Sequence, residues 1–256
     1  MSTSQQNKTR YSDILSILTT LVVTSFFFTY DVYYIVPTIL DPLGQRIMTV
    51  VSIWIVYNIV ANTWACYMIK NTMDTLPQDL QQPTKEEAHL WHHCDICDML
   101  VPPRAWHCKI CNCCMLKRDH HCNFTGSCIG HNNHRYFLWL TFFMSLGTGM
   151  VLVFNAIDVL RHYRTNTFAE LKKTVIFAIN LVSFLVPAIN FFIQLAAVIK
   201  NSTNFDKSGK DYSLGFWKNV QMVLGKRSFW TLISPTIDSP LAHHGSQWEV
   251  KEVKEN

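Results

Sequence analysis

Residues 94–128 read CDICDMLVPPRAWHCKICNCCMLKRDHHCNFTGSC, and this stretch holds eight of the nine cysteines in the chain. Cys94 with Cys97, and Cys108 with Cys111, have the C-x-x-C spacing that places two thiolates on one tight turn. Histidines are interspersed among the cysteines, which zinc coordination uses and disulfide bonds do not require. The stretch therefore predicts zinc binding, and its soft ligands suffice for two closed tetrahedral sites.

The stretch and its flank contain more candidate ligands than two zinc sites need. The surplus groups are Cys113, Cys122, His120, His131 and His134. One of them, Cys122, ends the run Asp119-His120-His121-Cys122, in which a thiol lies beside imidazoles and a carboxylate. Such neighbours activate a nucleophilic cysteine. Cys122 could equally be one more zinc thiolate, and spacing alone does not choose between the two interpretations.

Long apolar segments lie on both sides of the cysteine-rich stretch. The chain is 49% hydrophobic and only 16% charged, whereas soluble domains carry about a quarter charged residues. The apolar segments are residues 14–40, interrupted by Asp31, then 47–69, 136–157 and 174–199. Each has about the 20 residues that a helix needs to cross a bilayer. Buried helices of a soluble bundle would instead show a polar face.

These features predict an all-α integral membrane protein. Four transmembrane helices are expected, with a mostly irregular, cytosolic, two-zinc domain in the chain between helices two and three. The expected parts are a tail at 1–13, a transmembrane hairpin at 14–69, a linker at 70–90, the cysteine-rich domain at 91–135, a second hairpin at 136–199 and a tail at 200–256. Ten polar residues precede the first apolar segment, so we expect it to be a retained span rather than a cleaved signal. No internal repeat is apparent, and we expect little order beyond Ser234.

Basic residues set the expected orientation. They concentrate between spans two and three and after span four, and an even number of spans places both termini on the same side as the cysteine-rich domain. We expect that side to be cytosolic. The loop between spans three and four is an exception, with Arg161, Arg164, Lys172 and Lys173. The net charge is +4, and no basic recognition helix accompanies it, so no nucleic-acid partner is expected.

From Cys94 to Phe137 the sequence resembles the DHHC protein S-acyltransferase (palmitoyltransferase) family. The motifs that carry the resemblance are Pro102-Pro103-Arg104, His107-Cys108-x-x-Cys111-x-x-Cys114, Asp119-His120-His121-Cys122, Cys128-Ile129-Gly130 and Asn132-Asn133. The resemblance implies two structural zinc ions. One would be held by Cys94, Cys97, His107 and Cys114, and the other by Cys108, Cys111, His121 and Cys128. It also implies Cys122 as nucleophile, His120 as base and Asp119 as the group that orients His120.

The resemblance implies the family reaction as well. A long-chain acyl group would pass from acyl-CoA (palmitoyl-CoA), the co-substrate, through acyl-Cys122 to cytosolic cysteines of membrane-associated proteins. The lipid bilayer would be a further partner. The implied location is an endomembrane, Golgi or endoplasmic reticulum, with the active site and both termini cytosolic. Two alternatives stay open: a catalytically weak or inactive zinc-stabilised membrane scaffold, and a small transporter, for which Asn180, Asn190 and Gln194 are the polar groups of span four.

The sequence departs from the family pattern in several places. Asn123-Phe124 replaces the usual Pro-Trp after the nucleophile, and Ser202-Thr203-Asn204-Phe205 keeps one threonine of an expected Thr-Thr-x-Glu motif and lacks its acid. Candidate ligands for CoA phosphates are Arg104, Lys109, Lys117, Arg118 and Arg135. An acyl tail would reach the small residues of 145–149 in span three, which serve either close helix packing or a cavity.

Overall fold

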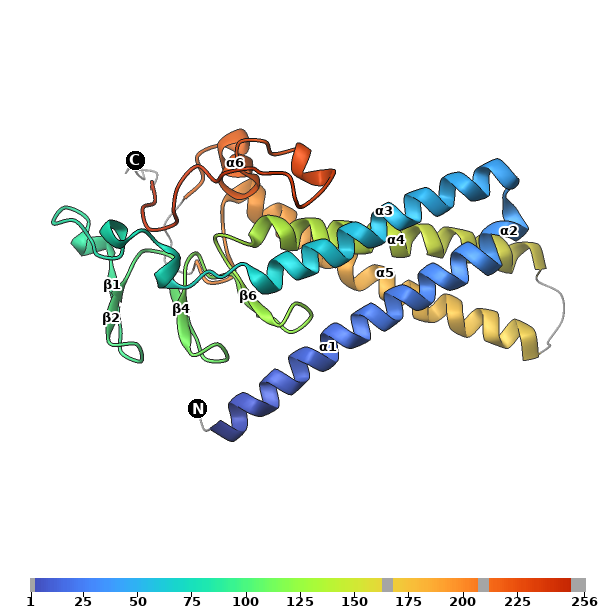
Figure 1. The fold of residues 1–256 in the computed structure, drawn as a ribbon, viewed down its shortest axis with the longest axis horizontal. Coiled ribbons are helices and arrows are strands. Elements are labelled where there is room, and N and C mark those ends of the chain that lie inside the picture. Colours follow the sequence, from blue (N-terminus) through green and yellow to red (C-terminus); the bar gives the residue numbers. More distant parts are fainter. Residues whose placement is uncertain (1–2, 163–167, 207–211, 250–256) are drawn as a thin grey trace, which may run out of the picture. The chain divides into compact units, whose positions relative to one another are not determined.

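The computed structural model describes residues 3–162, 168–206 and 212–249, without the side chains of 3–10, 162 and 168–170. Among these residues, four helices are long and apolar enough to cross a membrane (Figure 1). The candidate spans are Tyr11–Ile39, Pro42–Met68, His134–Arg161 and Leu171–Lys200. The prediction of a helical, multi-pass membrane protein is therefore confirmed. Arg164, one of the basic residues of the loop between spans three and four, lies outside the described residues.

The first span is built from three consecutive helical pieces, α1 (Thr3–Tyr30), the π-helix η1 (Asp31–Ile35) and α2 (Val36–Ile39). The second, α3 (Pro42–Met68), begins at a capped terminus. Asp41 Oδ1 accepts a hydrogen bond of 3.0 Å from the Gly44 backbone N–H, and Pro42 occupies the first helical position, where no N–H is needed. The third and fourth spans are α4 (His134–His162) and α5 (Phe168–Lys200).

Residue contacts divide the chain into two compact units. The membrane unit comprises residues 18–62 and 138–193, and the cysteine-rich unit comprises 1–17, 63–137 and 194–256. In the membrane unit, the buried Phe143 lies in the core, with the Trp54 ring edge-on at a centroid distance of 5.1 Å. The spans of this unit also contain buried carboxylates, Asp31 and Asp158, and Asp158 lies 3.0 Å from Lys173.

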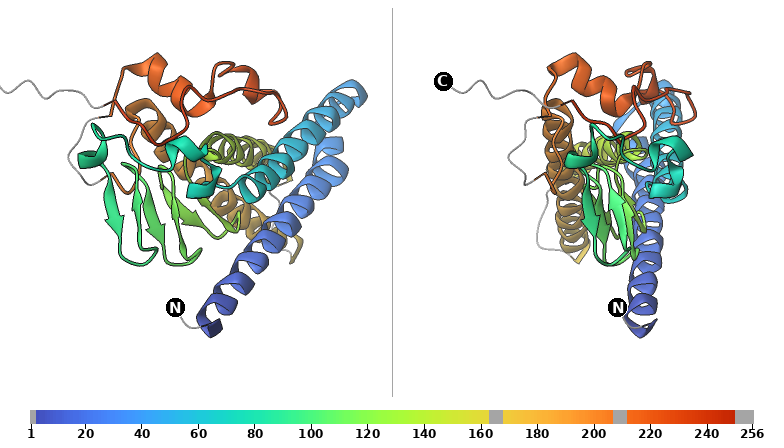
Figure 2. Two further views of the ribbon diagram at one scale, coloured as in Figure 1. Left: turned by 60° about the vertical axis from the view of Figure 1, so that its left-hand side comes forward. Right: turned by 90° about the vertical axis from the view of Figure 1, so that its left-hand side faces the viewer.

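The cysteine-rich unit contains three antiparallel hairpins of three-residue strands. They are β1 (His92–Cys94) with β2 (Met99–Val101), β3 (Trp106–Cys108) with β4 (Cys113–Met115), and β5 (His120–Cys122) with β6 (Ser127–Ile129). Figures 1 and 2 show the hairpins side by side. A small core that includes Met73, Trp91, Val101 and Leu116 packs under the first two hairpins. The segment between spans two and three, predicted to be mostly irregular, thus has short regular hairpins within it.

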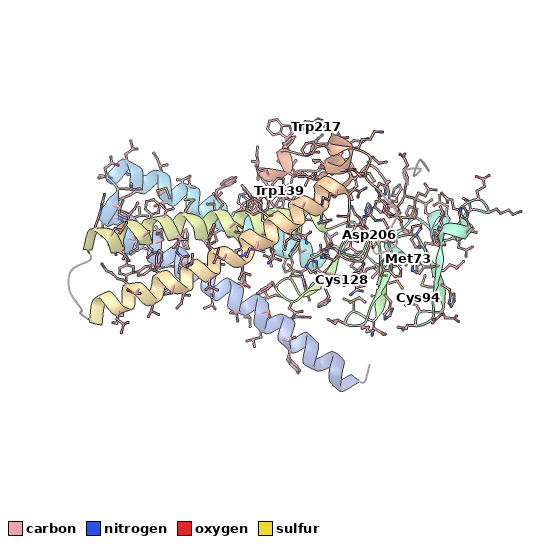
Figure 3. All side chains as sticks on the ribbon, turned by 180° about the vertical axis from the view of Figure 1, so that it is seen from behind. Met73, Cys94, Cys128, Trp139, Asp206 and Trp217 are labelled. Carbon is pink, nitrogen blue, oxygen red and sulfur yellow. The ribbon has the colours of Figure 1, made fainter. Side chains whose placement is uncertain are left out.

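Short helical turns complete this unit. They are η2 (Met73–Thr75), η3 (Gln78–Leu80), η4 (Ala88–Leu90) and η5 (Trp230–Leu232), and the longer helix α6 spans Phe216–Leu224. One face of α6, which includes Asn219 and Val223, is buried, whereas Phe216 and Trp217 are exposed. Figure 3 labels Trp217 on this helix. The buried Asn219 amide donates to the Ile199 carbonyl at 2.6 Å, which ties the start of α6 to the end of α5.

The expectation of little order beyond Ser234 is wrong for residues 235–249. Trp248 is buried and its ring lies 4.3 Å from the Arg104 guanidinium carbon. Ser239 is also buried, and its hydroxyl donates to the Leu224 carbonyl at 2.7 Å. Apolar and hydrogen-bonding contacts with the cysteine-rich hairpins therefore fold the tail back onto this unit, a long-range effect that local composition does not reveal.

Candidate functional site

The three hairpins repeat one pattern, with a His-Cys pair ending the first strand at residues 93–94, 107–108 and 121–122, an interval of 14. Four residues after each of these cysteines the chain takes a left-handed turn. The turn residues are Asp98 (φ 50°), Asn112 (φ 55°) and Gly126 (φ 61°). Glycine and asparagine favour this conformation. The expectation of no internal repeat was therefore wrong, and the evenly spaced His-Cys pairs were the signal that could have revealed it.

The first candidate metal cluster joins hairpins one and two. Its potential ligand atoms come from Cys94, Cys97, His107 and Cys114 and all lie within 4.8 Å of one another. Cys97 Sγ is 3.3 Å from His107 Nδ1 and 3.7 Å from Cys114 Sγ. Tetrahedral zinc, with bonds of about 2.3 Å to sulfur and about 2.0 Å to nitrogen, holds its ligand atoms about 3.5–3.8 Å apart. The cluster therefore fits zinc.

The second cluster joins hairpins two and three. Its ligand atoms come from Cys108, Cys111, His121 and Cys128, again within 4.8 Å. His121 Nδ1 lies 3.3, 3.7 and 3.9 Å from the sulfurs of Cys111, Cys128 and Cys108, respectively. His121 and Cys128 are direct cross-strand partners in the β5–β6 ladder, so their side chains share one face of that hairpin.

A carboxylate from the first span approaches this second cluster. Asp13 Oδ2 lies 3.4 Å from His121 Nε2, the ring nitrogen that faces away from the cysteine sulfurs. Asp13 is 8% exposed. A histidine that binds a metal through Nδ1 carries its proton on Nε2, and a carboxylate there fixes that tautomer and the ring orientation. No local sequence pattern links Asp13 to a residue 108 positions away.

The repeat explains why Cys122 has no place in either metal cluster. Each cluster takes the C-x-x-C pair of one hairpin and the His and last Cys of the next. In the third hairpin, Cys122 and Thr125 occupy the C-x-x-C positions, and the described residues contain no fourth hairpin to supply a second half. Both groups of four that the family resemblance implied are thus brought together, and Cys122 lies outside them. Cys113 also lies outside them, with its thiol 3.4 Å from the Cys111 carbonyl.

Strand geometry separates the two neighbouring histidines. Successive side chains of a strand point to opposite faces, so in β5 His120 shares a face with Cys122 while His121 faces the metal cluster. Asp119 Oδ2 lies 2.6 Å from His120 Nδ1, which leaves Nε2 of the imidazole for the thiol. Asp119 and Cys122 are only 1% and 5% exposed. The arrangement is that of an acid, a base and a nucleophile in series.

Charges in this series stabilise one another. Burial raises the pKa of the Cys122 thiol, but the hydrogen bond and charge of His120, together with hydrogen bonds from Thr125, outweigh burial and place the pKa below its ordinary value. Burial lowers the pKa of His120, whereas hydrogen bonds with Asp119 and Cys122 raise it to about 9. Both shifts favour a thiolate beside an imidazolium, the reactive form of a catalytic cysteine.

The Asp119 carboxylate is held from several sides besides His120. The Asn204 backbone N–H donates to Oδ1 at 2.9 Å, and the Asn204 amide donates to Oδ2 at 3.2 Å. Gln194 Nε2 donates to Oδ2 at 3.1 Å. Sequence reasoning missed Asn204 as a site residue and treated Gln194 only as a polar group in a span, because neither belongs to a local motif with Asp119.

An acidic residue follows the segment after span four, one position beyond the Glu that the family motif would place there. Moved by one residue, the segment reads Thr203-Asn204-Phe205-Asp206, with an aspartate at the fourth position. Asp206 forms a buried ion pair with Arg104, whose Nε lies 3.1 Å from Asp206 Oδ1. Breaking such a buried pair leaves an uncompensated charge and is strongly destabilising. Figure 3 labels Asp206 together with Cys94 and Cys128 of the hairpins.

Most candidate ligands for CoA phosphates make internal contacts instead. Arg104 and Lys117 are 3% and 2% exposed, and both donate to Asn201 Oδ1. Arg118 donates to the His107 carbonyl and Arg135 to the Ser239 carbonyl. Lys109 is exposed. The first four therefore join parts of the cysteine-rich unit, and only Lys109 keeps the exposed side chain expected of a phosphate ligand.

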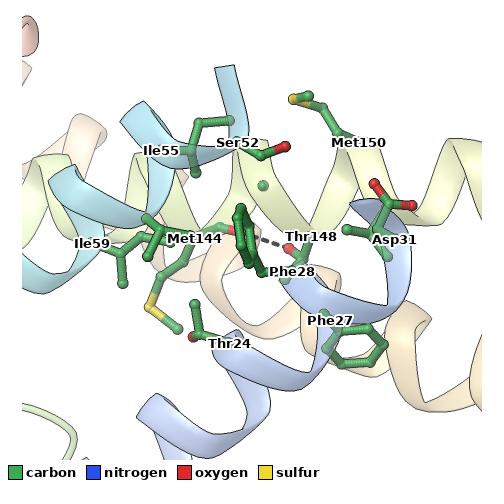
Figure 4. Close-up of a pocket in the computed structure, with 13 residues that line it drawn as sticks. Thr24, Phe27, Phe28, Asp31, Ser52, Ile55, Ile59, Met144, Thr148 and Met150 are labelled. Atoms are coloured by element: carbon green, nitrogen blue, oxygen red, sulfur yellow. Dashed lines mark hydrogen bonds between the residues drawn. The ribbon is translucent and has the colours of Figure 1, made fainter. Parts of the chain in front are cut away.

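The membrane unit contains two cavities that involve residues 145–149. One, of about 60 Å³, is lined by residues that include Phe28, Asp31, Gly147 and Thr148 (Figure 4). The other, of about 610 Å³, is lined mostly by apolar side chains and by Gly149. A Cβ atom on Gly147 would lie 3.1 Å from Ile55 Cγ2. The small residues thus serve both close packing and cavity lining, the two alternatives left open by the sequence.

The fold and the site define a class: multi-pass membrane proteins with a thiol site built on two Cys/His metal clusters. Residues 87–211 match the family model of the DHHC palmitoyltransferases. A curated relative from Danio rerio, described as "Probable palmitoyltransferase ZDHHC24", is 33% identical over 188 residues, which cover 62% of this chain and 62% of the relative. Residues 87–211 are therefore similar to the DHHC palmitoyltransferase domain, and the relative's match covers less than two thirds of either chain.

Proposed function

We propose that this protein is a protein-cysteine S-palmitoyltransferase that carries the acyl group on Cys122. The proposal rests on one observation: Asp119, His120 and Cys122 form a hydrogen-bonded series, and Cys122 belongs to neither metal cluster. The family match and the relative's description support the same reaction. An inactive scaffold would not require a buried acid–base pair beside Cys122.

The proposed reaction has two thiol-exchange steps. His120 takes the Cys122 proton, and the thiolate attacks the thioester carbon of a long-chain acyl-CoA. The new carbon–sulfur bond replaces the bond to CoA, whose thiolate leaves with the proton from His120. In the second step a target cysteine gives its proton to His120 and attacks acyl-Cys122, which releases the Cys122 thiolate. Asp119 holds the imidazole in the tautomer that both steps need.

We propose structural zinc in both Cys/His clusters. The eight ligands are those that the structure groups, and their separations fit tetrahedral coordination. Bound zinc stabilises the hairpins, since three-residue strands cannot do so alone. Because β5 carries both His121 and Cys122, the second ion would fix the strand that presents the nucleophile.

We further propose that the acyl tail occupies the hydrocarbon region and that the targets are membrane-associated proteins. Exposing an acyl tail to water costs about 0.8 kcal/mol per methylene, so the tail favours an apolar environment. The excess of basic residues outside the spans supports a cytosolic cysteine-rich unit and cytosolic termini. We also propose residence in the Golgi or endoplasmic reticulum, for which the family resemblance is the support.

The proposal is tested with purified, zinc-replete protein and labelled palmitoyl-CoA. We expect the wild type to acquire one hydroxylamine-labile acyl group and Cys122→Ser to acquire none, with equal zinc content in both. Cys113→Ser, which removes the other surplus thiol, serves as the matched control and should acylate normally. A well-folded wild type that binds zinc but forms no acyl-enzyme would favour the inactive scaffold instead.

A further inference from the structure

Gln194 differs from Asn190, the polar residue one turn earlier in the fourth span. Its amide Nε2 donates to Asp119 Oδ2 at 3.1 Å, and its Oε1 lies 2.7 Å from His134 Nε2. By contrast, the amide of Asn190, one turn earlier, donates to the Val186 carbonyl of its own helix at 2.8 Å. The Asn190 amide therefore serves its helix, whereas the Gln194 amide reaches two side chains outside it.

Burial leaves the Gln194 amide one possible orientation. Gln194, Asp119 and His134 are 3%, 1% and 1% exposed, so water does not compete for their hydrogen bonds. A carboxylate only accepts, so Nε2 of Gln194 must face Asp119. Oε1 then faces His134, which donates from Nε2. The side chain is thus locked between the beginning of α4 and the carboxylate of the proposed triad.

The hydrogen bonds to Asp119 show how Gln194 contributes to the orientation of that carboxylate. Oδ2 accepts hydrogen bonds from His120, Gln194 and the Asn204 amide, whereas Oδ1 accepts one from the Asn204 backbone N–H. Asn204 belongs to a loop, but Gln194 is fixed in α5. A donor on a rigid helix holds an orienting carboxylate more tightly than a loop does. Removing it would leave Asp119 freer to rotate away from His120.

We propose that Gln194 is a positioning residue for acyl transfer, holding Asp119 against His120 and thereby His120 against Cys122. The proposal rests on the proposed function and adds a residue that touches neither acyl-CoA nor Cys122. Hydrogen bonds to charged groups are among the strong ones, and misorientation of an acid–base pair lowers rate rather than substrate binding. We expect a loss of about tenfold in the rate of acylation.

The test uses Gln194→Met, which has similar length and no hydrogen-bonding amide, with Asn190→Leu as matched control on the same helix. The maximal rate of acyl-enzyme formation from palmitoyl-CoA is measured by rapid quenching, with the half-saturating concentration and zinc content. Gln194→Met should lower the maximal rate about tenfold at unchanged half-saturation and zinc content, and Asn190→Leu should match the wild type. If Gln194→Met folds poorly, Gln194→Leu, which also has no donor toward Asp119 and fills less space, should show the same loss.

A second measurement separates positioning from general packing. In an Asp119→Asn background, Gln194→Met should cause no further loss, because the residue acts through Asp119. Losses that multiply, or a wild-type rate in both folded Gln194 variants, would overturn the inference. Failure of the proposed function would look different: the wild type itself would form no acyl-enzyme.

Discussion

Single residues in this protein are distinguished by the face on which they lie. His120 and His121 are adjacent, yet β5 points the first toward Cys122 and the second toward the Cys108, Cys111 and Cys128 sulfurs. Sequence spacing could not assign these roles, because both histidines are within reach of both chemistries along an unfolded chain. Successive side chains of a strand point to opposite faces, and this alternation assigns His120 to the thiol and His121 to the metal cluster.

The two histidines should therefore fail in different ways. His120→Ala should keep two zinc ions and slow acyl-enzyme formation by about 10²–10⁴-fold, since it removes the general base. His121→Ala should lose one zinc ion and fold poorly. Elemental analysis and single-turnover acylation distinguish the outcomes. Two zinc ions in both variants would contradict the assignment.

Asp13 should affect the metal without touching it. Its carboxylate faces His121 Nε2 at 3.4 Å, and loss of such a partner costs about 10–100-fold in metal affinity. Asp13→Ala should therefore release one of its two zinc ions to a chelator faster than the wild type does, while the other ion serves as an internal control. Equal release of both ions in variant and wild type would show that Asp13 has no role at the cluster.

At the scale of elements, the hairpins act as interleaved pairs. Cys94 and Cys97 of the first hairpin cluster with possible ligands of the second, and Cys108 and Cys111 of the second cluster with possible ligands of the third. Because only the second cluster includes a residue of β5, equivalent cysteine substitutions in the two clusters should affect acylation unequally. Cys97→Ser and Cys111→Ser should each lose a zinc ion, but Cys111→Ser should reduce acylation more, because its cluster includes the strand that carries Cys122. Equal acylation in the two variants would contradict this order.

Some elements of the fold and site could be predicted from the sequence, and others could not. The four spans and the two ligand sets followed from long apolar segments and from the family pattern of cysteines and histidines. The 14-residue repeat was missed because Thr125 replaces a cysteine in its third copy and the clusters interleave across copies. Asp13, Gln194 and Asn204 were missed as site residues because only the folded chain brings them to His121 and Asp119. Contacts across such separations leave no periodic signal in one sequence.

At the scale of the whole molecule, the proposed triad and the small residues of span three belong to different units. The proposed triad lies in the cysteine-rich unit, and the cavities near residues 145–149 lie in the membrane unit. Gly147→Phe should fill the small cavity and shorten the preferred acyl chain, because overpacking leaves less apolar volume. A competition among acyl-CoAs of different length, read by mass spectrometry of the acyl-enzyme, measures the preference. An unchanged preference in a folded, zinc-replete variant would mean that Gly147 serves packing alone.

In the proposed reaction Cys122 carries the acyl group while eight other side chains hold zinc. The most direct measurement is peptide mass spectrometry of zinc-replete protein after brief exposure to palmitoyl-CoA. We expect a hydroxylamine-labile palmitoyl mass on the peptide that contains Cys122. Cys66, the ninth cysteine, which lies in α3, should stay unmodified, as should Cys113 and the eight ligand positions, with two zinc ions per chain. Palmitate on another cysteine with Cys122 unmodified, or a folded, zinc-bound protein with no acyl group, would contradict it.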